Sequence, residues 1–327
     1  MQVVRGKEAG SLPPEARVFA LGTFDGVHRG HAALLDAARR MADRRAAAGE
    51  AATAWALTFH PHPAQSLAPD RAPLCIGDLE DRLDWLARTG IAGTWVVPFD
   101  RALAALDPSV FYDTILKAGG ARGLVVGHDF TFGKGRAGDG RVLARLGQPE
   151  GVEVEVVPPV RTPEGLIVSS TRIRGRIAAG DLAGAREMLG RDVELSSEVR
   201  SGAGRGGGLG FATANLLPEG RVVPGQGVYS GWGRIEGEAR AYPAAINVGR
   251  APTFGALARA QIEAHLLGHP PGSLAGRRLR LCFLRRLRGE RHFPGPEALV
   301  AQIQKDVART EADCARLPPP PWAGEGA

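Results

Sequence analysis

The sequence predicts a chain of the α/β plus β class, with a doubly wound parallel sheet first and a small antiparallel β-barrel with a closing helix second. Strand-like and helix-like stretches alternate up to about residue 190, which is typical of a parallel sheet covered on both faces. From there, short strand-like runs follow one another between glycines and prolines, which is typical of an antiparallel barrel. An amphipathic stretch at residues 296–316 predicts the closing helix.

The hydrophobic pattern of the first half separates its strands from its helices. Apolar side chains recur at three- and four-residue steps at Leu34, Leu35, Ala38 and Met41, so one face of a helix is apolar there. Short apolar runs between such stretches predict buried strands. The predicted strands are 17–21, 54–59, 94–97, 123–126 and 152–157, and the predicted helices are 31–48, 78–88, 108–118 and one or two within 171–189.

The pattern of predicted elements changes near Gly190, from alternating strands and helices to consecutive short strands. The strands predicted for the barrel are 193–199, 228–235, 244–248, 261–267 and 278–284. The last residues, LPPPPWAGEGA, are rich in proline and glycine, which favours disorder. We therefore predict a first domain at 1–188, a second at 189–316 and a disordered tail at 317–327.

The composition narrows the classes of function. The 327 residues suit about two domains, and the net charge of +6 suits nucleic acid, an anionic membrane surface or phosphorylated substrates. Aromatic residues make up only 6%, and no block of basic residues alternates with them, so we expect no nucleic-acid partner. The charge can also serve solubility alone.

The cysteines and the apolar runs indicate a cytoplasmic protein with reduced thiols. Cys75, Cys282 and Cys314 lie far apart and form no C-x-x-C pair, which argues against a zinc site and a disulfide framework. The N-terminus has no apolar signal-peptide core, and no run of about 18 apolar residues occurs. We expect no membrane partner.

The segment from Gly22 to His31, GTFDGVHRGH, lies between a predicted strand and a predicted helix. In an open α/β sheet such a junction binds anions against the helix N-terminus, and glycines let the backbone approach a phosphate. His28 and His31 lie three residues apart, so both can point at one anion and donate hydrogen bonds as its charge grows. The segment predicts a nucleotidyltransferase that binds ATP. A metal pair or two core histidines are the alternatives.

A second cluster, SSTRIR at 169–174, has the same chemistry. Hydroxyl groups at a helix N-cap followed by arginines supply hydrogen-bond donors and positive charge for a polyphosphate. The alternative is an ordinary N-cap followed by a solvated arginine.

These two motifs, with LTFHPHP at 57–63, VGHDFTFG at 126–133 and RAGD at 136–139, resemble the prokaryotic bifunctional riboflavin kinase/FAD synthetases. The resemblance extends over roughly residues 15–315. It implies a Rossmann-like nucleotidyltransferase domain that transfers AMP from ATP to FMN, releasing pyrophosphate and making FAD.

The resemblance also implies roles for individual residues. The phosphate of FMN is the nucleophile, so His28 and His31 would stabilise the ATP phosphates, with Mg²⁺, rather than form a covalent intermediate. The remaining ATP contacts would come from Gly22, Thr23, Phe24, Asp25, Gly26, Ser169, Ser170, Thr171 and Arg174. The flavin side would be shaped by His60, Pro61, His62, Asp129 and Phe130. His60 and the Asp81-Arg82 pair depart from the commoner family pattern, but neither removes a phosphate ligand.

The barrel half carries a glycine-rich loop, RGGGLGFATAN at 205–215, which alone could be a flexible surface loop. The resemblance implies that GFATAN replaces the kinase signature GFPTAN. Thr213 and Asn215 would then bind Mg²⁺ and the phosphates of ATP, together with Gly202, Arg205 and Gly210. Glu263 would be the general base that takes the proton of the riboflavin 5′-hydroxyl, since a carboxylate within hydrogen-bond reach suits that role. By position alone, Glu263 could be a surface carboxylate.

The kinase motif departs from the family more than the first motif does. Ala212 replaces a proline, Ser201 a histidine and Gly207 a basic residue, so the loop loses more entropy when it orders around ATP. We expect a kinase that is active but has a raised KM for ATP. The alternative is an FMN adenylyltransferase with a weak or inactive kinase domain.

Two other classes of function remain open. A nucleotidyltransferase acting on another phosphorylated substrate would explain the first half but leave the GFATAN segment unused. A non-catalytic flavin-binding protein would not need the two histidines of an ATP site. The predicted partners are therefore riboflavin, FMN, FAD and ATP, and the sequence does not fix the oligomeric state.

Overall fold

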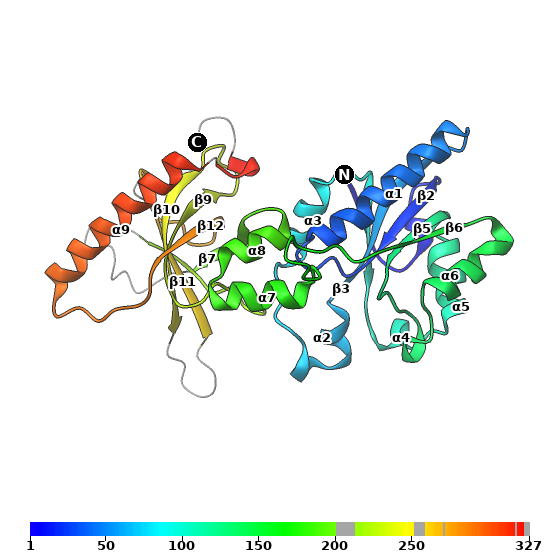
Figure 1. The fold of residues 1–327 in the computed structure, drawn as a ribbon, viewed down its shortest axis with the longest axis horizontal. Coiled ribbons are helices and arrows are strands. Elements are labelled where there is room, and N and C mark those ends of the chain that lie inside the picture. The colour runs from blue at the N-terminus through cyan, green and yellow to red at the C-terminus, as the bar shows by residue number, and fades with distance from the viewer. Residues whose placement is uncertain (201–212, 252–258, 271, 318, 324–327) are drawn as a thin grey trace. The chain divides into compact units, whose positions relative to one another are not determined.

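The computed structural model describes residues 1–200, 213–251, 259–270, 272–317 and 319–323. The chain divides into two compact units (Figure 1). The first comprises Met1–Pro73 and Asp78–Ser170, and the second comprises Leu74–Gly77 and the chain from Thr171 onward. This division of contacts falls within the predicted first domain, because the helices after Thr171 pack with the barrel half of the chain.

The first unit contains a six-stranded sheet in which every pair of neighbours is parallel. Its order is β1-β4-β3-β2-β5-β6. The strands are β1 (Gln2–Arg5), β2 (Ala16–Leu21), β3 (Ala52–His60), β4 (Gly93–Pro98), β5 (Ala121–Gly127) and β6 (Glu153–Val157). The strand order reverses at β2, which has β3 on one side and β5 on the other. Ligands of open α/β sheets bind at such a point, outside the carboxyl ends of the strands.

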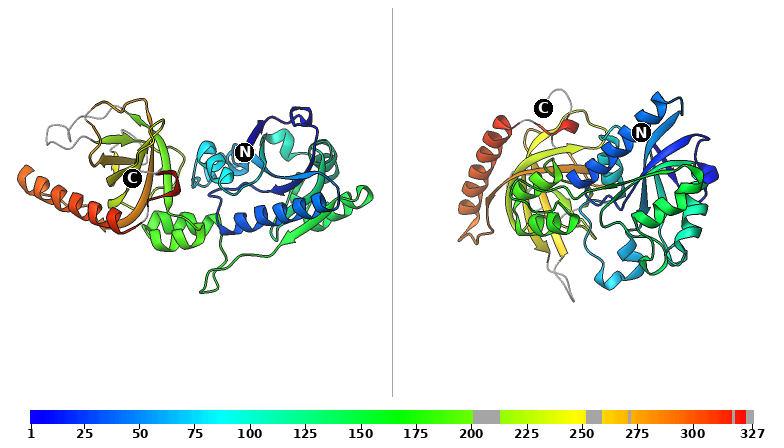
Figure 2. Two further views of the ribbon diagram at one scale, coloured as in Figure 1. Left: turned by 90° about the horizontal axis from the view of Figure 1, so that it is seen from above. Right: turned by 45° about the vertical axis from the view of Figure 1, so that its right-hand side comes forward.

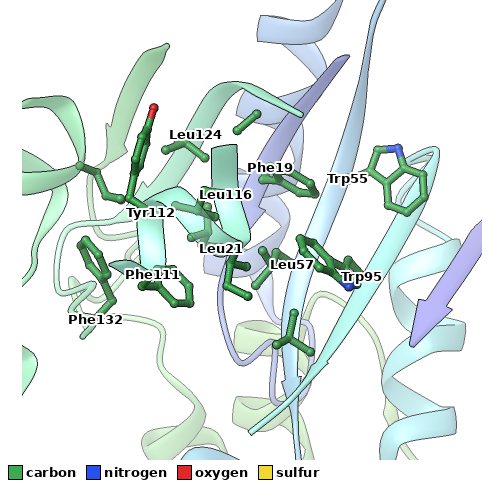
Figure 3. Packing of buried hydrophobic residues seen from close by; sticks show 14 of the residues in the cluster. Phe19, Leu21, Trp55, Leu57, Trp95, Phe111, Tyr112, Leu116, Leu124 and Phe132 are labelled. Atoms are coloured by element: carbon green, nitrogen blue, oxygen red, sulfur yellow. The ribbon is translucent and has the colours of Figure 1, made fainter. Parts of the chain in front are cut away.

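Helices cover both faces of this sheet (Figure 2), and its inner strands β2, β3, β4 and β5 are largely buried, whereas the edge strands β1 and β6 expose polar residues. Helix α1 (Arg29–Ala47) packs on β2, β3 and β5. A large core cluster includes Phe19, Trp55, Trp95, Phe111 and Tyr112 (Figure 3). The other helices are α2 (Pro63–Leu67), α3 (Leu79–Ala87), α4 (Arg101–Ala104), α5 (Pro108–Phe111) with a π-helical turn at Tyr112–Lys117, and α6 (Gly140–Gly147).

The second unit is a closed antiparallel barrel of order β10-β11-β8-β7-β12-β9. Its strands are β7 (Val193–Arg200), β8 (Ala214–Leu216), β9 (Gly227–Ile235), β10 (Tyr242–Ala251), β11 (Arg259–Leu266) and β12 (Arg278–Arg288). Helices α7 (Ser170–Ala179) and α8 (Leu182–Leu189) precede the barrel, and α9 (Pro296–Arg316) packs on β9, β10 and β12. The predicted fold class is confirmed.

Two buried carboxylates hold α9 on the barrel. Asp306 is bonded to the guanidinium of Arg288 through two nitrogens, each 2.9 Å from Asp306 Oδ2. Asp313 accepts a hydrogen bond of 2.7 Å from the buried hydroxyl of Ser230. These contacts fix the register of the closing helix. In the part of the chain that the structure describes, no helix is long and apolar enough to cross a membrane.

The tail differs from its predicted disorder. Pro321–Ala323 form a 3-10 turn, and only 7% of the Trp322 side chain is exposed. The indole packs with Trp232, Cys282 and Cys314, and the guanidinium of Arg280 lies 5.5 Å from its ring centroid. Burial of one large aromatic side chain outweighs the disorder-favouring composition around it. Strands β1 and β8 and helices α2, α4 and α6 were also not predicted.

Candidate active sites

The loop after β2 has a strained backbone. Phe24 and Val27 both have positive φ angles, 51° and 36°, which non-glycine residues seldom adopt and which occur most at functional sites. The side chain of Phe24 is fully buried, and its ring packs edge-on against that of His31, with the centroids 5.2 Å apart. This buried aromatic ring holds the loop in its strained conformation.

His28 and His31 form a reciprocal cap at the start of α1. The Nδ1 atom of His28 accepts the backbone N–H of His31 at 3.2 Å, and Nδ1 of His31 accepts that of His28 at 3.3 Å. The rings stack with centroids 3.6 Å apart. Because both Nδ1 atoms accept, the proton of each neutral ring is on Nε2. The helix cap therefore fixes the tautomer of both rings and makes each Nε2 a donor.

Gly30 leaves the room that the His28 ring occupies. A Cβ atom at this position would lie 3.0 Å from Cε1 and 3.1 Å from Nδ1 of His28, which is tighter than ordinary contact. Any residue larger than glycine at position 30 would therefore displace the ring of His28.

Ser170 joins the second phosphate motif to this loop. The hydroxyl of Ser170 donates a 2.8 Å hydrogen bond to the backbone oxygen of Asp25, and Ser169 precedes it. Thr171 and Arg174 belong to the second unit, where a guanidinium nitrogen of Arg174 lies 3.1 Å from the Thr171 hydroxyl. Of the motif, only Ser169 and Ser170 are therefore grouped with the loop that carries the histidines.

Arg82 is a site-supporting residue that the sequence did not reveal. Its side chain is buried, and one guanidinium nitrogen donates to the backbone oxygens of Thr23 at 2.6 Å and Phe59 at 3.1 Å. The hydroxyl of Thr58 also donates to the oxygen of Thr23 at 3.1 Å. Together these bonds join the loop after β2 to the end of β3. The sequence predicted a helix over 78–88 and marked the Asp81-Arg82 pair as a departure from the family pattern, but it gave no signal that Arg82 is buried.

The residues predicted for the flavin side follow the ends of β3 and β5. His60 ends β3, and burial, with the charges of Arg82 and Arg5, lowers the pKa of His60. His62 caps α2 by accepting the backbone N–H of Ala64 at 3.2 Å, and Pro61 lies between them.

Beyond β5, the chain turns at once. The backbone N–H of Phe130 bonds to the oxygen of Gly127 at 3.1 Å, and its ring stacks on that of Phe132. The Asp129 carboxylate is 83% exposed. The two groups of predicted flavin residues thus lie at the edge of the sheet that also carries the histidine loop.

The barrel brings the predicted kinase residues Asn215 and Glu263 together. They are direct cross-strand partners on β8 and β11. Their neighbours along each strand, Ala214 and Ala264, are buried, so both polar side chains lie on the outer face of the barrel. Thr213 is exposed just before β8. The predicted phosphate contacts Gly202, Arg205 and Gly210 lie outside the described residues.

Comparisons with known proteins match both units. The family model of FAD synthetase matches residues 12–172, and that of riboflavin kinase matches residues 189–313. A bifunctional riboflavin kinase/FMN adenylyltransferase of Pseudomonas fluorescens is 36% identical over 95% of this chain and 97% of its own length. This chain belongs to that bifunctional family. It carries both a FAD synthetase and a riboflavin kinase domain, as the resemblance predicted.

Further relatives agree. The Escherichia coli K12 protein of the same description is 34% identical over 94% of this chain and 96% of its own, and that of Bacillus subtilis is 32% identical over 88% and 90%. A crystal structure of a Streptococcus pneumoniae protein described as a macrolide-efflux protein has a TM-score of 0.82, at 29% identity over 95% of this chain and 99% of its own. The fold of this chain therefore closely resembles that of a solved structure.

Proposed function

We propose that His28 and His31 carry the adenylyl transfer. The phosphate oxygen of FMN attacks the α-phosphorus of ATP, a new phosphorus–oxygen bond forms, and the bond to the departing pyrophosphate breaks. Charge grows on the phosphoryl oxygens during this step, so Nε2–H donors already oriented toward them lower its barrier. Reciprocal capping, which sets both tautomers before ATP binds, is the observation that supports this role. Gly22, Thr23, Phe24, Asp25 and Gly26 would supply backbone contacts to the nucleotide.

We propose that the same site also includes the second phosphate motif, at 169–174, and the residues predicted for the flavin side. Ser169, Ser170, Thr171 and Arg174 would hold the triphosphate, and His60, Pro61, His62, Asp129 and Phe130 would lie against the flavin. Ser170 supports it best, since its hydroxyl is bonded to the loop that carries the histidines.

For the riboflavin kinase reaction, we assign the general base to Glu263. Its carboxylate would take the proton of the 5′-hydroxyl as that oxygen attacks the γ-phosphorus of ATP and ADP leaves. Asn215 and Thr213 offer the neutral oxygen atoms that Mg²⁺ accepts. When bound, Mg²⁺ would neutralise phosphate charge.

The experiment is incubation of the purified protein with riboflavin, ATP and Mg²⁺, followed by chromatography of FMN and FAD. We expect both products, and Glu263→Gln should lose FMN formation while still converting added FMN into FAD. FAD from FMN without any FMN from riboflavin would instead support an adenylyltransferase whose kinase is inactive. The proposed ligands are riboflavin, FMN, FAD and ATP. We propose that the protein acts in the cytoplasm and has no nucleic-acid partner.

A further inference from the structure

Gln261 lies between the two kinase residues Asn215 and Glu263. It is two residues before Glu263 on β11, so both side chains lie on the same outer face of the barrel. Its Nε2 atom is 3.2 Å from Oδ1 of Asn215 and 3.2 Å from Oε1 of Glu263. The side chain thus bridges two strands at the point where both proposed functional groups stand.

The chemistry of the three groups fixes the direction of both bonds. An ionised carboxylate can only accept, so the amide of Gln261 must turn its NH₂ group toward Glu263. The second hydrogen of that NH₂ then donates to Asn215, which must present its oxygen and turn its own NH₂ away. A carbonyl oxygen has two lone pairs, so Oδ1 of Asn215 keeps one for a cation. The bridge therefore selects the amide orientation that a magnesium ligand requires.

We propose that Gln261 is a positioning residue of the riboflavin kinase site, which aims the carboxylate of Glu263 and sets the amide orientation of Asn215. This inference rests on the proposed role of Glu263. Gln261 itself acts through its two neighbours and takes no part in the proton transfer.

Gly249 and Asn247 on β10 (Tyr242–Ala251) face the two bridged residues of β11. Gly249 is the cross-strand partner of Gln261 on β10, and a Cβ atom there would lie 3.1 Å from Oε1 of Glu290. Asn247 is the cross-strand partner of Glu263. Because Gly249 has no side chain, the carboxylate of Glu290 can approach the strands that carry Gln261 and Glu263. A neutral hydrogen-bond donor at position 261 suits two nearby carboxylates better than a further acceptor would.

Two substitutions of similar size separate a donor role from a packing role. Gln261→Met keeps the length of the side chain and removes both donated bonds, and Gln261→Glu keeps the shape but places a third carboxylate beside Glu263. We expect kcat of the kinase to fall about tenfold in Gln261→Met, and further in Gln261→Glu, with KM for riboflavin within about twofold. Gln148→Glu, an exposed glutamine of the first unit, is the matched charge control and should leave both activities unchanged.

Two measurements on the Gln261 variants test whether the fold is intact. FAD formation from added FMN and the thermal unfolding of the second unit should both be unchanged. Unchanged kinase kcat in both Gln261 variants, with Glu263→Gln inactive, would overturn the inference and leave the proposed function standing. A fall in kcat with an equal rise in KM and a lower unfolding temperature in the Gln261 variants would also overturn the inference, because this pattern indicates a packing role. An active Glu263→Gln would refute the proposed function itself.

Discussion

The imidazole rings of His28 and His31 stack with their planes inclined by only 12°, and each ring accepts a hydrogen bond from the backbone of the other residue. A capping box usually pairs a short polar residue with a glutamate or glutamine. Here two titratable rings fill both positions. The same bonds that begin α1 therefore orient the groups proposed to meet ATP.

Gly30→Ala tests the space between these rings. The new Cβ atom would push the His28 ring from its position, since the contact distance would be 3.0 Å. We expect FAD formation to fall by about tenfold or more, although alanine raises helix propensity by about 0.5–1 kcal/mol. Steady-state FAD synthesis and thermal unfolding measure the two effects. Gly175→Ala in α7, where the Cβ would meet nothing within 4 Å, is the control for propensity. Undiminished FAD synthesis in Gly30→Ala would show that the ring position is not critical.

His28→Asn separates capping from catalysis. Asparagine is a good N-cap, so this variant should unfold like the unmodified protein, whereas His28→Ala should lose about 1 kcal/mol. Both should lose FAD formation by about a hundredfold, because neither offers the Nε2 donor. Denaturant unfolding and FAD chromatography check the two parts. Retained FAD synthesis in His28→Asn would assign His28 to the cap alone.

Arg82 should control the first activity and leave the second unchanged. Its guanidinium holds the backbone oxygens of Thr23 and Phe59, and methionine would leave both without this donor. We predict an adenylyl transfer about tenfold slower in Arg82→Met. Arg82→Lys should recover part of the rate, because its ammonium can also donate to backbone oxygens but lacks the planar, preoriented geometry of the guanidinium. The FMN formed from riboflavin in the same samples is the internal control. Normal adenylylation of FMN by Arg82→Met would contradict this role of Arg82.

The pKa of Tyr112 predicts that the free energy of unfolding of the first unit falls at alkaline pH. Burial, with the carboxylate of Glu150, raises the pKa of Tyr112 from 10.0 to about 12. The unfolded chain thus releases this proton at a lower pH than the folded chain, so the contribution is full below pH 10 and is lost as pH rises toward 12. Tyr112→Phe should show a flatter fall in the free energy of unfolding over that window. Tyr242→Phe is the control, and identical slopes in both variants would contradict the assignment.

The sequence predicted what depends on periodicity, and missed what depends on tertiary contacts. Alternating strands and helices were sufficient for the parallel sheet, and the three-residue spacing placed His28 beside His31. Strand β1 was missed because its polar residues, Gln2 and Arg5, hide a short edge strand. The burial of Arg82 depends on backbone oxygens 23 and 59 positions away in sequence, which no local pattern encodes.

Trp322 illustrates the same limit at the other end of the chain. Its neighbours favour disorder, but a hydrophobic cluster on the barrel accepts the ring. Gln261 was overlooked for a related reason, since its role appears only when strand register sets Asn215 opposite Glu263.

The most direct test of the account is the product pattern of the double variant His28→Ala/His31→Ala, incubated with riboflavin, ATP and Mg²⁺ and resolved by chromatography. We predict that FMN accumulates at the rate of the unmodified protein and that no FAD forms. FAD formation at an undiminished rate would contradict the assignment of adenylyl transfer to the stacked histidines.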